Sequence, residues 1–90
     1  MALFDLGRVV ATPGALDALR RSSQSPGEFL VKHVRGEWGD LDAEDAEANR
    51  TALLEGARIL SAYETRLGDK VWVITEADRS STCVLLPEEY

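Results

Sequence analysis

The sequence has few residues that cross-link a chain or bind metals, and it has no long apolar run. Its 90 residues include one cysteine and one histidine. The single cysteine, Cys83, excludes a disulfide within the chain and is typical of a protein in the reducing cytoplasm. Apolar runs of a few residues are too short to cross a membrane as a helix, and Asp5 and Arg8 make the start unlike a secretion signal. We therefore expect a cytoplasmic protein without membrane contact.

Basic residues are scarce and unevenly placed. The chain has 10 lysines and arginines against 16 acidic residues, which gives a net charge of −6. Residues 1–36 hold five basic and three acidic side chains (+2), whereas residues 37–90 hold five basic and thirteen acidic ones (−8). The negative part repels phosphate, which disfavours direct nucleic-acid binding. A basic protein surface is the partner that this charge favours.

The acidity is concentrated in one short segment. It contains Glu37, Asp40, Asp42, Glu44, Asp45 and Glu47. Their spacing lacks the regular oxygen ligands and the central glycine of a calcium loop, and no other motif indicates a metal or a cofactor. One interpretation is a solvated helix start whose carboxylates suit the helix dipole. The other is a surface that imitates a phosphate backbone, since side chains on successive helical turns repeat about every 5 Å.

Hydrophobic residues make up 44% of the chain, enough for a single domain over residues 1–90. Alternating apolar residues bounded by turn signals predict strands over residues 3–11, 57–64, 70–76 and 81–86. Helical spacing and start signals predict helices over residues 13–21, 26–35 and 43–55. The order β-α-α-α-β-β-β predicts an α+β fold, with an antiparallel sheet of three or four strands and the helices packed on one face.

Each expected helix begins at a capping signal. Thr12 precedes Pro13, and Asp42 precedes an acidic first turn. Ser25 is followed three residues later by Glu28, the pattern of a capping box. These signals fix where the helices start.

The expected strands carry apolar residues on both faces, whereas the helices have too few apolar residues to cover more than one. Trp72 and Ile74, or their neighbours on the opposite face, are therefore expected to face water. An exposed patch of this kind favours self-association or partner docking. We expect a homodimer through the uncovered sheet face as one outcome.

The only histidine, His33, has two interpretations. The structural one places it at the edge of a helix's apolar face, bonded to a backbone carbonyl. The catalytic one makes it a general acid or base with Arg58, Arg79, Thr75 or Glu76 as helpers, in a toxin-like ribonuclease that needs no metal. The negative net charge counts against RNA as a substrate.

Two further residues in the central part of the chain have a structural and a functional interpretation. Trp38, between Gly36 and Gly39, is either an exposed anchor for a partner or a plug at the end of the core. Asn49 falls near the apolar face of the third helix, and we expect it to brace the Trp38 loop or the first strand.

Five segments resemble a family of short bacterial proteins that are usually called hypothetical or plasmid-related. Some members carry the label of a type I restriction–modification subunit, for which this chain is too short. The resemblance covers nearly the whole chain and brings no catalytic residues. The segments are residues 6–15 (LGRVVATPGA), 36–41 (GEWGDL), 60–63 (LSAY), 72–80 (WVITEADRS) and 85–90 (LLPEEY).

The resemblance implies a setting of plasmids, phages and other mobile DNA, in which small acidic proteins often antagonise host defence. We therefore interpret the chain as a small interaction protein, an anti-CRISPR or antirestriction protein that binds a basic protein surface. The expected contact is the acidic segment, with Trp38 as its apolar anchor. The alternative is the ribonuclease with His33 and an arginine in catalytic roles.

Overall fold

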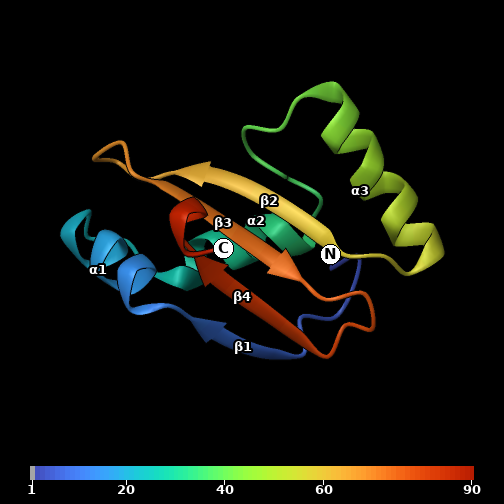
Figure 1. The fold of residues 1–90 in the computed structure, drawn as a ribbon, viewed down its shortest axis with the longest axis horizontal. Helices are drawn as coiled ribbons and strands as arrows, with labels where there is room; N and C mark the ends of the chain where they lie inside the picture. Colours follow the sequence, from blue (N-terminus) through green and yellow to red (C-terminus); the bar gives the residue numbers. More distant parts are fainter. Residues whose placement is uncertain (1) are drawn as a thin grey trace.

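The computed structural model describes residues 2–90 and confirms the α+β fold and the expected order of elements (Figure 1). The strands are β1 (Arg8–Ala11), β2 (Ile59–Glu64), β3 (Lys70–Thr75) and β4 (Ser81–Leu85). The helices are α1 (Pro13–Arg21), α2 (Pro26–Val34) and α3 (Ala43–Glu55), and a short 3-10 helix, η1 (Pro87–Glu89), follows β4. Among the described residues, no helix has both the length and the apolar content to cross a membrane.

The four strands form one mixed sheet in the order β1-β4-β3-β2. Strands β2, β3 and β4 are antiparallel neighbours, but β1 runs parallel to β4, so the expectation of a purely antiparallel sheet is wrong. Backbone bonds from Arg8 N to Ser80 O and from Thr12 N to Val84 O set this direction. A short edge strand has the same alternating pattern in either direction, so contacts distant in sequence decide its orientation.

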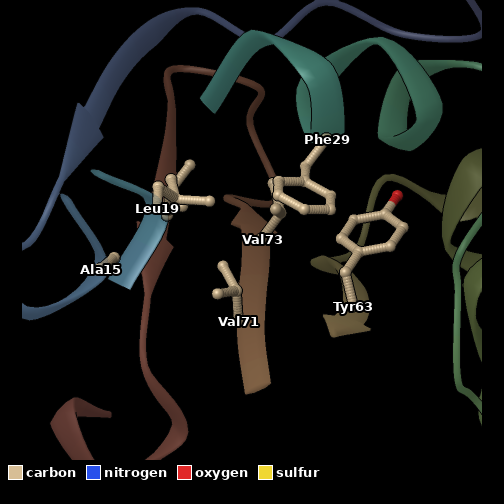
Figure 2. Close-up of a cluster of buried hydrophobic side chains, with 7 residues drawn as sticks. Ala15, Leu19, Phe29, Tyr63, Val71 and Val73 are labelled. Atoms are coloured by element: carbon tan, nitrogen blue, oxygen red, sulfur yellow. The ribbon is translucent and has the colours of Figure 1, made fainter. Parts of the chain in front are cut away.

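Helices α1 and α2 cover one face of the sheet (Figure 1). Their buried side chains meet the inward-facing side chains of the strands in one cluster of Ala15, Leu19, Phe29, Tyr63, Val71, Val73 and Val84 (Figure 2). The rings of Phe29 and Tyr63 stack with their centroids 5.1 Å apart. Apolar burial of this kind stabilises the fold by about 25 cal/mol per Å² removed from water.

Helix α3 lies beside the β2 edge of the sheet (Figure 1). Its buried residues are Asn49 and Ala52. A second apolar cluster joins it to the sheet, formed by Trp38, Ala52 and Ile59 with Phe4, Leu41, Ala46 and Leu53 around them. The helical layer on the sheet face therefore consists of α1 and α2, and α3 extends the molecule beyond β2.

Two of the three expected helix caps form as the sequence predicts. The side chains of Thr12 and Asp42 each accept a hydrogen bond from a backbone N–H in the first turn. Gly56 ends α3 in the left-handed conformation, at φ +72°. The capping box expected at α2 is wrong, because Glu28 accepts a hydrogen bond from a glutamine side chain and Ser25 offers its backbone carbonyl instead.

The face of the sheet opposite α1 and α2 is partly covered by the end of the chain. Helix η1 lies in front of this face (Figure 1), and the Tyr90 ring meets Trp72 edge-on with 5.8 Å between centroids. Ile74 and Leu85 are each only 6% exposed, so the expectation that Ile74 faces water is wrong. Trp72 keeps part of its surface in contact with solvent. The last five residues thus supply a small second cover.

Candidate functional site

His33 occupies the interior between α2 and the sheet. Its side chain is 0% exposed. The imidazole lies edge-on to the rings of Phe4 and Trp38, with centroid distances of 5.2 Å and 6.0 Å. His33 points inward because it follows Phe29 by four residues, which places both on one face of α2. In this position the ring cannot meet a substrate from solution.

A chain of hydrogen bonds runs from His33 through three hydroxyls. The His33 Nδ1 atom lies 2.5 Å from Ser61 Oγ, and Nε2 lies 2.8 Å from Thr75 Oγ1. Thr75 Oγ1 lies 2.8 Å from Thr82 Oγ1, which donates to Leu6 O at 2.7 Å. Each hydroxyl has one proton, so Thr75 donates to Thr82 and the His33 Nε2–H donates to Thr75. Burial keeps the ring uncharged at neutral pH, so Nδ1 accepts from Ser61 and the imidazole is the neutral Nε2–H tautomer.

The interior of the protein keeps this imidazole uncharged. Burial lowers the pKa of His33 from 6.5 to about 4, because the charged form loses its hydration. The geometry favours the structural interpretation, with two hydroxyls in place of the expected backbone carbonyl. Ser61 and Thr82 were not anticipated as its neighbours. Both are polar residues at inward-facing positions of predicted strands, and a buried polar side chain needs a hydrogen-bond partner, which is the feature that could have identified them.

Arg58 and Arg79 do not join His33 in a common site. Arg58 is exposed and binds the Glu76 carboxylate at 3.1 Å and the hydroxyl of the C-terminal tyrosine at 2.8 Å. Arg79 donates to backbone carbonyls at the end of α3 and just before β2, and its guanidinium carbon lies 5.6 Å from the centre of the Phe4 ring. Thus only Thr75, of the expected helpers, is hydrogen-bonded to the histidine. The described residues do not assemble the accessible histidine–arginine cleft that a ribonuclease of this type requires.

The acidic residues form an exposed surface that leads from the end of α2 into α3, here called the acidic rim. It consists of Glu37, Asp40, Asp42, Glu44, Asp45 and Glu47, all exposed. Among residues 2–90, the only ion pair of the rim joins Glu47 to Arg50, at 2.9 Å. Asp42 also caps α3. The other carboxylates are available to cations of a partner.

Trp38 does not belong to this surface. It is 8% exposed and packs in the cluster beneath α3, where its ring stacks on Phe4 with 6.3 Å between centroids. The expected apolar anchor is therefore wrong, and the alternative of a core plug is correct. Leu54 is the exposed apolar residue next to the rim, at 89% exposure. Helical spacing places it seven residues after Glu47, on the same face of α3.

The segment around the rim also closes the β2 edge of the sheet. The Asn49 side chain donates to Leu60 O at 2.6 Å and accepts from Leu60 N at 3.1 Å. Two residues along the strand, Ala62 N donates to Trp38 O at 3.0 Å and Ala62 O accepts from Asp40 N at 2.6 Å. Asn49 is thus a brace, but it braces β2 and not the Trp38 loop or the first strand. Closed strand edges cannot recruit further strands.

Asn49→Ala is expected to destabilise the protein by about 2 kcal/mol, because both backbone groups of Leu60 lose their partner at a partly buried edge. Urea unfolding measures the loss. Thr51→Ala, an exposed substitution on the same helix, is the control and should stay within about 0.5 kcal/mol of the parent. Equal stability of the two variants would contradict the bracing role.

The described part of the chain contains no further enclosed site for a ligand or a metal ion. Residues 2–90 contain no pocket and no group of three side chains placed to hold a metal ion. Comparisons with family models, with curated proteins and with solved structures find no match for this chain.

Proposed function

We propose that this chain is a non-enzymatic docking protein whose acidic rim binds a basic surface of another protein. The observation that carries the proposal is the set of six exposed carboxylates with a single ion pair of their own. Hydrogen bonds to β2 from Trp38 and Asp40 within the rim segment, and from Asn49 just after it, hold the backbone of the rim against the sheet. A surface of one charge speeds and orients association with a surface of the opposite charge. Leu54 supplies the apolar contact in place of Trp38.

Antagonism of host defence is the specific role that we propose. Enzymes that cut or bind DNA carry basic channels for phosphate, and a row of carboxylates competes for such a channel. The mobile-DNA setting implied by the sequence resemblance favours a partner in a restriction or CRISPR system. The single cysteine is consistent with action in the cytoplasm.

Phage plating on strains with and without a restriction or CRISPR system tests this role. We expect production of the protein to restore plating on the defended strain without growth arrest. The rim variant combines Asp40→Asn, Glu44→Gln, Asp45→Asn and Glu47→Gln, which removes four charges (from −6 to −2) and leaves the Asp42 cap in place. Exposed ion pairs contribute about 0.2–1 kcal/mol each, so binding should weaken roughly 10- to 100-fold and plating should fall.

A matched control removes the same charge from other surfaces, by Asp5→Asn, Glu28→Gln, Glu64→Gln and Glu88→Gln. We expect this variant to plate like the parent, with both variants shown to be folded by circular dichroism. Full plating with the rim variant contradicts the proposed surface. Equal loss in both variants assigns the effect to net charge, and growth arrest on expression favours the ribonuclease alternative.

A further inference from the structure

The two edges of the sheet differ in their protection. Asn49 and the 38–40 segment close the β2 edge, whereas no element among residues 2–90 lies beyond β1 (Figure 1). Arg8 N and Thr12 N bond to the β4 side. Because backbone groups alternate along a strand, the N–H and C=O groups of Val9 and Ala11 point away from the sheet. Val9 is 42% exposed, so β1 offers an unpaired apolar edge to another strand.

We propose that β1 pairs antiparallel with β1 of a second copy of this chain, which makes a two-fold dimer with one continuous eight-stranded sheet. In the proposed register Val10 lies opposite Val10 of the partner subunit. Val9 then lies opposite Ala11 of the partner subunit, and Ala11 lies opposite Val9 of the partner subunit. Each of these pairs exchanges two backbone hydrogen bonds. The edge is thus complementary to itself and uses every outward backbone group of Val9 and Ala11.

The side chains match in the same register. The two Val10 side chains, each 43% exposed in one copy, meet at the closer type of antiparallel pair, about 4.5 Å between Cα atoms. Arg8 stands opposite Thr12 of the partner subunit, and the Thr12 hydroxyl holds the Glu89 carboxylate. That hydrogen bond lowers the pKa of Glu89, so the carboxylate is charged.

Charge complementarity favours a second copy over an unrelated peptide as the occupant of this edge. Within residues 2–90, neither Arg8 nor Glu89 forms an ion pair. The dimer places them together twice, once on each side of its axis. An unrelated extended peptide would make the backbone bonds without these two ion pairs.

The dimer is independent of the proposed function and leaves the acidic rim free. The rim lies by α3 beyond β2, at the opposite end of the strand order from β1. Two rims would therefore stand at the two ends of the eight-stranded sheet. This dimer also differs from the face-to-face dimer expected from the sequence, which would use the Trp72 face that Tyr90 and η1 partly cover.

Sedimentation equilibrium and residue-resolved amide hydrogen exchange, over a concentration series of the purified protein, test the proposal. We expect a monomer–dimer equilibrium in which exchange at the Val9 and Ala11 amides slows by about tenfold or more as the dimer forms. Val10→Lys sets two like charges against each other at the axis and should weaken the dimer by about tenfold or more. Val10→Thr keeps an uncharged β-branched residue there and should retain the dimer.

A double-mutant cycle tests the register. Arg8→Gln and Glu89→Gln are each expected to weaken the dimer about three- to fivefold, and together no more than either one alone. A monomer at every concentration overturns the proposal. A dimer whose Val9 and Ala11 amides still exchange rapidly overturns it in favour of another interface, such as the Trp72 face. Additive effects of the two substitutions overturn the Val10-centred register.

Discussion

Replacing Gly39 by alanine is expected to cost about 3–5 kcal/mol of stability, out of the roughly 5–13 kcal/mol available to a domain of this size. Gly39 has φ +77°, and a Cβ atom there would overlap the carbonyl oxygen of Ala62 and the ring of Tyr63. Relief of the overlap moves the 38–40 segment away from β2. That movement breaks its two backbone hydrogen bonds to Ala62.

Gly56→Ala is the matched control for this experiment. Gly56 has nearly the same backbone conformation, φ +72°, but open space surrounds the position of a Cβ atom. Gly56→Ala is expected to cost about 1 kcal/mol of stability, which lowers the thermal unfolding midpoint by roughly 4–8 °C. Gly39→Ala should lower the same midpoint by at least about 12 °C. Equal losses would mean that the positive φ sets the cost and that the close approach of Gly39 to β2 contributes nothing.

These two glycines also show how far local sequence predicts the fold. Gly56 follows a helical pattern that starts after the Asp42 cap, so both ends of α3 are recognisable from neighbouring residues. The turns between the last three strands are equally local, and the bounds predicted for these strands agree with the structure to within about two residues. The first strand is predicted to begin at residue 3, but it begins at Arg8. Gly39 has no such signal, because its role depends on Ala62 in a strand distant in sequence.

The candidate site was less predictable for the same reason. Charge alone predicts the exposure of the acidic rim, since carboxylates rarely lose their hydration. The direction of Trp38 depends on packing against Phe4 and Ile59, which flank it only after folding. The surroundings of His33 require Ser61 and Thr82 from two different strands to meet around α2. No window of the sequence contains these contacts.

Acid is expected to weaken the fold through His33 before most carboxylates titrate. The folded-state pKa of about 4 lies below the ordinary value of 6.5, so the unfolded chain binds the proton first as the pH falls. The contribution is fully present above pH 6.5 and is lost progressively as the pH falls towards 4. Between pH 7 and pH 5 the free energy of unfolding should drop by about 2 kcal/mol, measured by urea unfolding across that range.

One substitution isolates this effect, because His33 is the only histidine. His33→Gln keeps a donor and an acceptor for Thr75 and Ser61 but cannot titrate, so its stability should be nearly constant between pH 7 and pH 5. We expect it to start about 1–3 kcal/mol below the parent, since the amide fits the two hydroxyls less well. His33→Leu removes the partner of the Ser61 hydroxyl and the donor to Thr75, which keeps only its bond to Thr82, and should cost more, about 3–5 kcal/mol. A parent slope that persists in His33→Gln would assign the acid sensitivity to carboxylates. A flat His33→Gln profile would tie it to the buried neutral imidazole, whose burial also keeps it from acid–base catalysis at pH 7.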